Sequence, residues 1–199
     1  MIALVTGGSG SGKSEYAENL ISRLGVGKRI YIATMKPWDE ECRKRILRHQ
    51  VMRQEKQFET IECYSKLNKL TLPQESKVSA VLLECMSNLV SNELFGFEEE
   101  VFLPSNEFVE KQIMEGIKNL SLQTNHLVIV TNEVFSDGDY YSAQTNHYRM
   151  VLGQINQKIA DMANLVVEVV AGIPIVLKNE FIENNPQVCY SYNKQHPDT

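Results

Sequence analysis

The sequence predicts an α/β fold of the P-loop type: a mostly parallel sheet flanked by helices, with a C-terminal antiparallel hairpin. Three observations lead to this expectation. A glycine-rich loop, Gly7 to Ser14, follows a short apolar run at residues 2–6. Apolar runs typical of buried strands then alternate with amphipathic stretches typical of helices. Near the end, two apolar runs are separated only by a short turn that contains glycine and proline.

The expected elements follow one another in strand–helix order. Strands are expected at residues 2–6, 30–33, 78–83, 127–131, 165–170 and 175–177. Helices are expected at residues 14–24, 39–53, 89–97, 108–122 and 148–163. The stretch 39–53 has no internal Gly or Pro and begins at Asp39, a favourable capping residue. We expect Gly172-Ile173-Pro174 to form the last turn, residues 1–180 to form one domain and residues 181–199 to form a polar tail.

The composition excludes several classes of protein. The net charge of −5 argues against a basic surface for nucleic acid. No apolar run approaches the roughly 20 residues of a membrane span. The four cysteines are scattered without a CxxC pair, which argues against a structural zinc site or a disulfide framework. We therefore expect a cytoplasmic protein with free thiols.

The glycine-rich loop carries the strongest chemical signal. Its residues Gly7, Gly8, Ser9, Gly10, Ser11, Gly12, Lys13 and Ser14 fit the pattern G-x-x-x-x-G-K-[ST] between a predicted strand and a predicted helix. Glycines let backbone N–H groups turn toward phosphate oxygens, and the helix N-terminus adds partial positive charge. The lysine neutralises phosphates and the final serine can ligate Mg²⁺. A chance glycine-rich turn would lack the flanking strand and helix.

Polar residues gather where predicted strands end. Thr6, Thr34, Glu84 and Asn132 each follow an apolar run, and ligands of parallel sheets bind at the carboxyl ends of strands. Glu84 stands where P-loop proteins carry the acidic residue that holds Mg²⁺ through water. The alternative for Glu84 is an ordinary surface carboxylate just past a strand.

The stretch 39–53 contains a histidine between two arginines. Arg45, His49 and Arg53 are spaced i, i+4 and i+8, so they lie along one side of the expected helix. A neutral imidazole there could attack a phosphorus atom and form a covalent intermediate. The spacing alone nevertheless favours an ordinary solvated basic face, because further Arg and Lys residues surround the histidine.

Over residues 2–178 the chain resembles the adenosylcobinamide kinase / adenosylcobinamide-phosphate guanylyltransferase family of cobalamin biosynthesis, through a series of motifs in the same order. In chain order they are Thr6-Gly7-Gly8, Ser11-Gly12-Lys13-Ser14, Tyr16-Ala17-Glu18, Tyr31-Ile32-Ala33-Thr34, Asp39-Glu40-Glu41, Arg45-Ile46, His49, Arg53, Ile61-Glu62, Leu82-Leu83-Glu84-Cys85, Asn92, Thr131-Asn132-Glu133-Val134, Gly153, Asn156-Gln157 and Ala171-Gly172-Ile173-Pro174. Such a series is far more specific than a P-loop alone.

The resemblance implies two activities. The family phosphorylates adenosylcobinamide with ATP or GTP and then transfers GMP from GTP to that phosphate. It implies that His49 is the guanylylated residue, that Lys13 acts in catalysis, and that Ser14 and Glu84 hold Mg²⁺. Nucleotide contacts are implied in the loop and at Thr34, Met35, Lys36, Gln50, Val51, Met52, Arg53, Glu62 and Glu84. It also implies a corrinoid acceptor and a homo-oligomer, a trimer in the family.

The sequence departs from the family pattern in three places that bear on function. Gly10 stands where the family loop usually carries Arg. Residues 135–140 stand where the family usually has a glycine-rich stretch and a proline. Met150 also replaces an acidic residue. These changes keep two alternatives open: a divergent P-loop transferase that has lost the kinase activity or changed its acceptor, and a non-catalytic GTP-binding regulator.

Overall fold

A computed structural model of the chain describes residues 1–24, 27–37, 40, 43, 47, 56–73, 78–96, 104–135 and 141–180. The expected tail, residues 181–199, lies outside these ranges. Within them, all seven strands belong to one sheet. None of the described helices combines the length and apolar character needed to cross a bilayer.

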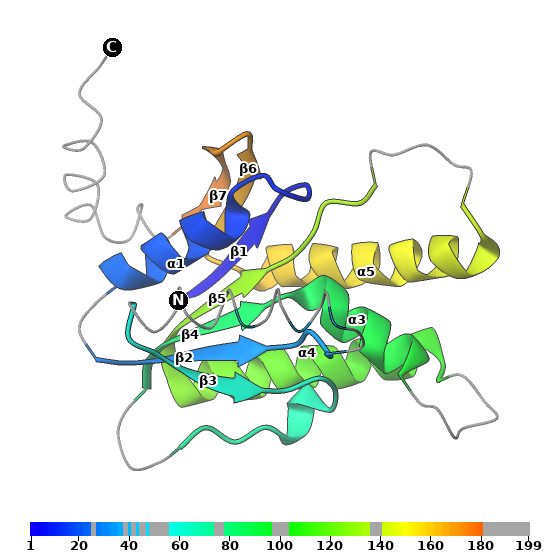
Figure 1. Cartoon of the computed structure of the whole chain (residues 1–199), viewed down its shortest axis with the longest axis horizontal. Coiled ribbons are helices and arrows are strands. Elements are labelled where there is room, and N and C mark those ends of the chain that lie inside the picture. The colour runs from blue at the N-terminus through cyan, green and yellow to red at the C-terminus, as the bar shows by residue number, and fades with distance from the viewer. Residues whose placement is uncertain are drawn as a thin grey trace.

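The sheet has the order β3-β2-β4-β5-β1-β6-β7 (Figure 1). Its strands are β1 (Ile2–Thr6), β2 (Lys28–Ala33), β3 (Phe58–Glu62), β4 (Val78–Glu84), β5 (Thr124–Val130), β6 (Leu165–Val170) and β7 (Ile173–Asn179). Every pairing is parallel except the antiparallel pair β6–β7. The α/β fold with a mostly parallel sheet and a C-terminal hairpin is therefore confirmed.

Helices cover both faces of the sheet (Figure 1). Helix α1 (Lys13–Arg23) packs on one face, and α3 (Met86–Phe95), α4 (Asn106–Gln123) and α5 (Ala143–Met162) pack on the other. A 3₁₀ turn, η1 (Leu67–Lys69), lies against α4. Because side chains alternate along a strand, Val5 packs with α1 residues and its neighbour Leu4 packs with the three-helix side. Strands covered on both faces must be apolar throughout, which explains the continuous runs in the sequence.

Helix boundaries follow local capping chemistry. The Ser105 hydroxyl accepts a hydrogen bond from the Phe108 N–H at the start of α4, and the Ser142 hydroxyl does the same for Thr145 at the start of α5. Helix α5 therefore begins at Ala143, five residues before the expected start at Tyr148. Of the helix expected over residues 39–53, only Glu40, Arg43 and Leu47 are described, and these three are helical.

From the sequence, one strand was missed and one turn was misplaced. Strand β3 was not expected, because Phe58-Glu59-Thr60-Ile61-Glu62 carries two glutamates; as an edge strand it exposes them. The last turn was placed at Gly172–Pro174, whereas the left-handed pair is Ala171 and Gly172, with φ of 50° and 82°, and β7 begins at Ile173. Proline is tolerated there because β7 is also an edge strand.

Candidate functional site

The glycine-rich loop connects β1 to α1 at the carboxyl edge of the sheet. Gly10 and Gly12 have φ of 72° and 90°, a conformation that a glycine adopts without steric cost. The Ser11 N–H donates to the Gly8 carbonyl at 3.2 Å, and the Lys13 ammonium donates to the same oxygen at 2.9 Å. The lysine side chain, 8% exposed, therefore lies folded along the concave side of the loop.

The loop is held from outside by two neighbouring segments. The Gly172 N–H, in the β6–β7 turn, donates to the Ser11 carbonyl at 2.8 Å, and the Glu133 N–H, after β5, donates to the Gly7 carbonyl at 3.0 Å. A Cβ built on Gly7 would lie 2.5 Å from the Val169 carbonyl oxygen. Gly7 is thus required for close approach to β6, and the hairpin fixes the loop's position.

A hydroxyl and a carboxylate meet at the base of the loop. The Ser14 hydroxyl donates to Glu84 Oε1 at 2.5 Å, and Glu84 Oε2 is buried without a hydrogen-bond partner among the described residues. An unsatisfied buried carboxylate oxygen is costly unless another group ligates it. Hydroxyl and carboxylate oxygens beside a phosphate-binding loop are the donors that Mg²⁺ accepts, so the pair fits this ion.

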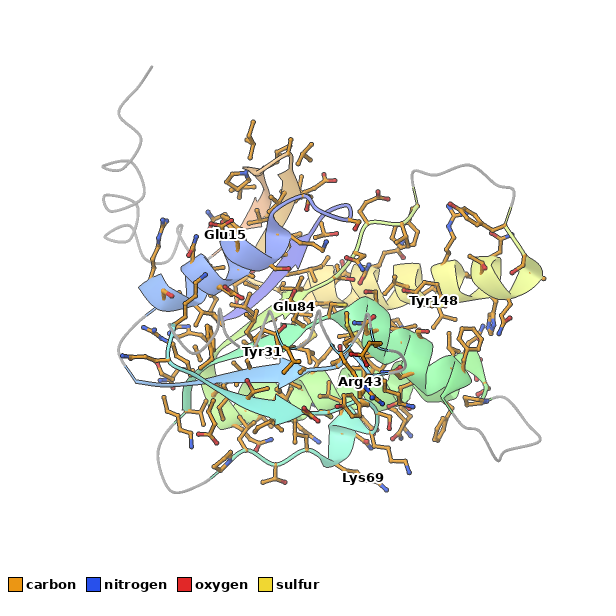
Figure 2. All side chains as sticks on the ribbon, viewed as in Figure 1. Glu15, Tyr31, Arg43, Lys69, Glu84 and Tyr148 are labelled. Carbon is orange, nitrogen blue, oxygen red and sulfur yellow. The ribbon has the colours of Figure 1, made fainter. Side chains whose placement is uncertain are left out.

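A cavity of about 360 Å³ extends from the loop across the ends of β4, β2 and β3. This volume is in the range of small-molecule sites. Figure 2 shows Glu84 and Tyr31, two of its lining residues, on the neighbouring strands β4 and β2. The lining comprises Ser9–Ser14, Tyr31, Ala33, Met35, Thr60, Glu62, Tyr64, Glu84, Cys85, Asn88 and Asn132.

The end of the cavity at β3 combines an aromatic wall with a carboxylate. Tyr31 packs edge-on against Phe58, with ring centroids 6.2 Å apart. The Tyr64 hydroxyl donates to Glu62 Oε2 at 2.6 Å. Burial, and then the Glu62 carboxylate, raise the pKa of Tyr64 to about 12, so the phenol stays a donor at neutral pH. The arrangement presents a flat apolar surface next to an anionic acceptor.

Buried polar residues brace this end of the sheet. The Asn92 amide donates to the Thr34 and Tyr64 carbonyls, both at 2.9 Å. The Thr34 hydroxyl donates to the Cys85 carbonyl and accepts from the Cys85 N–H, both at 2.8 Å. The Glu84–Cys85 peptide bond is cis. Burial raises the pKa of the Cys85 thiol, which keeps it protonated beside the phosphate loop.

The structure brings together part of the predicted site. Ser9–Ser14, Met35, Glu62 and Glu84 line one cavity. Thr34 is fully buried beside it, and the Lys36 ammonium lies 3.5 Å from the Gly96 carbonyl. His49, Gln50, Val51, Met52 and Arg53 lie outside the described residues. Gly7 and Gly8 lie between β1 and the turn at Ser9 and Gly10.

Sequence reasoning missed four polar or aromatic residues of the lining, of which Thr60 belongs to β3. Tyr31 lies in the middle of an apolar strand, Tyr64 follows β3, and Asn88 is in the first turn of α3. The strand-favouring residues Phe58, Thr60 and Ile61 are the signal that could have revealed β3 and, with it, this wall.

Comparison with known proteins gives consistent matches. The family model described as cobinamide kinase / cobinamide phosphate guanyltransferase matches residues 3–177. Two relatives are bifunctional adenosylcobalamin biosynthesis proteins named CobU, from Escherichia coli (strain K12) and from Salmonella typhimurium. They are 34% and 33% identical to the chain over 184 residues. Each alignment covers 89% of the chain and 100% of the CobU protein. CobP of Pseudomonas aeruginosa is 29% identical over 178 residues, covering 89% of the chain and 97% of CobP. Among solved structures, the flagellar accessory protein FlaH from Methanocaldococcus jannaschii gives a TM-score of 0.46 at 10% identity, over 89% of this chain and 78% of that one.

Proposed function

The chain belongs to the cobinamide kinase / cobinamide phosphate guanyltransferase family, and on that premise we propose that it phosphorylates adenosylcobinamide and then transfers GMP from GTP to the phosphate. It is thus an enzyme of cobalamin biosynthesis. The observation that carries the proposal is the cavity shared by the phosphate loop, Glu84 and Glu62. The same chemistry supports a cytoplasmic location, where nucleoside triphosphates are available.

Phosphate binding rests on the loop. Its backbone N–H groups and the N-terminus of α1 favour anionic oxygens, and the Lys13 ammonium, now on the Gly8 carbonyl, can turn to a phosphate within the same loop. Ser14 and Glu84 would hold Mg²⁺, which when bound neutralises charge on the phosphate oxygens. Positioning and charge neutralisation are the main demands of phosphoryl transfer.

We propose that the far end of the cavity selects the base. The edge of guanine carries two adjacent N–H donors, and the Glu62 carboxylate accepts hydrogen bonds only. Tyr31 supplies an aromatic surface at the same end. Adenine lacks the donor pair, so this end favours GTP for guanylyl transfer, while ATP or GTP can serve the phosphoryl step through contacts to the phosphates alone.

His49 is proposed as the nucleophile of guanylyl transfer. A neutral imidazole nitrogen attacks the α-phosphorus of GTP, a nitrogen–phosphorus bond forms and pyrophosphate leaves. An oxygen of adenosylcobinamide phosphate then attacks the same phosphorus and releases the imidazole. The support for this role is the match to the family pattern around His49.

The decisive experiment separates the two halves of the reaction. Purified protein is incubated with α-³²P-labelled GTP and Mg²⁺, and the protein should acquire an acid-labile label that adenosylcobinamide phosphate discharges. His49→Ala should abolish the label while leaving phosphorylation of adenosylcobinamide intact, and Lys13→Ala should abolish both. A label that persists in His49→Ala would refute the assignment of the nucleophile.

The assembly is also proposed. We propose a homotrimer, supported by the resemblance to the family. Light scattering after size exclusion should give three times the chain mass of 22.7 kDa. A monomeric mass with full activity would contradict it.

A further inference from the structure

A second concave surface lies on α5, beside the segment that leaves β5. This acceptor groove is lined by Phe135, Asn146, Met150, Gly153, Gln154 and Gln157, together with Arg149. The α5 members recur every three or four residues, so they form one stripe of the helix. A Cβ built on Gly153 would lie 3.4 Å from the Phe135 ring. The glycine therefore hollows the stripe beneath the ring.

Direct contacts fix the groove next to the nucleotide cavity. The Asn132 amide donates to the Ser87 hydroxyl at 2.7 Å, and the Tyr148 hydroxyl, on α5, donates to the Ser87 carbonyl at 3.2 Å. The side chains of Thr131 and Asn156 are also hydrogen-bonded, at 2.9 Å. Asn132 itself lines the nucleotide cavity. Figure 2 shows Tyr148 on α5 and Glu84 at the end of β4.

The span from one site to the other is short. Asn132 lines the cavity and Phe135 lines the groove. Three residues of extended chain span about 10 Å at most. A ligand seated in the groove can therefore extend an arm to the phosphates at the glycine-rich loop.

The side chains of the groove define the ligand chemistry. Asn146, Gln154 and Gln157 are exposed primary amides, and a primary amide has two donor hydrogens and two acceptor lone pairs. Asn146 uses one donor on the Tyr141 carbonyl, at 3.2 Å, and accepts from Arg149 at 3.5 Å, which leaves one donor and one lone pair for a ligand. Phe135 and Met150, 40% and 49% exposed, offer apolar surface between them. The charged member, Arg149, donates to the Phe135 carbonyl at 3.0 Å and lies 4.9 Å from the Tyr141 ring centre. The surface suits a flat apolar ring edged with amides.

We propose that the acceptor groove binds the corrin ring of cobinamide, with its peripheral amides paired to Asn146, Gln154 and Gln157 and its hydroxyl-bearing arm directed past Asn132. A corrin is a broad ring carrying primary amide side chains, which matches both features of the surface. This inference rests on the proposed function and adds the place where its acceptor binds.

The test compares variants in the groove with a matched variant outside it. Gln154→Leu/Gln157→Leu removes two amides at nearly constant volume, and Gln144→Leu, at an exposed position in the first turn of α5, is the control. Each lost hydrogen bond should weaken binding roughly 3- to 10-fold. The double variant should therefore raise KM for adenosylcobinamide, and Kd for cobinamide in equilibrium dialysis, roughly 10- to 100-fold. Labelling by GTP should stay unchanged, which also shows that the variant is folded.

Three outcomes decide the matter. A selective loss of acceptor affinity in the double variant, and in Met150→Lys, supports the groove. Wild-type turnover with an unchanged acceptor KM in both variants overturns the groove alone. A wild-type protein that labels with GTP but neither binds nor converts cobinamide overturns the proposed acceptor, and the groove assignment with it.

Discussion

The three glycines at positions 7, 8 and 10 provide a matched test of how the phosphate loop is built. A Cβ on Gly7 would lie 2.5 Å from the Val169 carbonyl oxygen and 2.6 Å from Ser11 Oγ, whereas real Cβ contacts essentially never fall under 3.0 Å. A Cβ on Gly8 or Gly10 meets nothing within 4 Å, but Gly10 has φ of 72°. Gly7 also has φ of 155°, so Gly7→Ala combines a steric clash with a conformational cost, Gly10→Ala imposes the conformational cost alone, and Gly8→Ala imposes neither.

The expected magnitudes differ enough to be resolved. Gly7→Ala forces β6 or the loop to shift, which costs about 1–3 kcal/mol of unfolding free energy, comparable to overpacking a core. Gly10→Ala costs about 1–2 kcal/mol for the left-handed backbone, partly offset by a less flexible unfolded chain. Gly8→Ala should leave stability unchanged or raise it by up to about 1 kcal/mol.

Unfolding in urea is monitored by circular dichroism, and unfolding free energies are compared at constant m-value. GTP affinity is measured on the same samples. Gly7→Ala should show the largest loss of both stability and affinity, because the clash displaces the loop backbone. If Gly8→Ala proves as costly as Gly7→Ala, or Gly7→Ala changes nothing, the packing of the loop against β6 does not hold it in place.

Four further predictions concern single side chains. Glu84→Gln keeps the shape of the site but should weaken Mg²⁺ activation of GTP turnover about 10- to 100-fold. An unchanged Mg²⁺ titration would refute the Mg²⁺-holding role inferred from the Ser14–Glu84 contact. Asn92→Ala leaves the Thr34 and Tyr64 carbonyls without their shared donor. It should lower the unfolding free energy by about 1–3 kcal/mol and raise KM for GTP. Asn119→Ala, on the exposed surface of α4, is the control. Burial, and then the N-terminal ammonium, lower the pKa of His126 below 6.5. The unfolded chain therefore binds more protons, and stability should fall as pH drops below that value. His126→Gln should flatten the dependence of the urea midpoint on pH from about pH 7.5 to 5.5, and an unaltered dependence would exclude the histidine as its source. Gly10→Arg restores a cation where space is open and should lower the KM for GTP a few-fold in low salt but not in high salt, at a stability cost of about 1–2 kcal/mol; equal effects at both ionic strengths would show that charge is not the cause.

The sequence was a good guide where one physical signal dominated. β1, β4 and β6 are mostly apolar because both faces of the sheet are covered, so their positions could be predicted closely. The phosphate loop is set by local glycine chemistry and required no tertiary information. The side-by-side placement of Ser14 and Glu84 followed from the rule that parallel strands end at one edge.

The remainder depended on tertiary context. β3 is an edge strand that exposes Glu59 on one face and Glu62 on the other, so its glutamates concealed a strand. Tyr31 belongs to the buried core cluster on the α1 side and also lines the cavity, a double position that its place in an apolar strand does not reveal. The contact between Gly172 and Ser11 joins opposite ends of the described chain, and no periodicity in the sequence reports it. The roles proposed for His49 and its neighbours stay predictions from the family resemblance.

The hydrogen bond from Gly172 to Ser11 also sets an order of events during synthesis of the chain. The phosphate loop is synthesised well before β6, which pairs with β1, and before the turn that holds the loop. With translation at about 5–20 residues per second, synthesis from Ser11 to Gly172 takes about 8–32 seconds, and the nascent loop lacks its support for that time. A stalled nascent chain ending before β6 should therefore fail to retain GTP, while one that exposes residues through 180 should retain it.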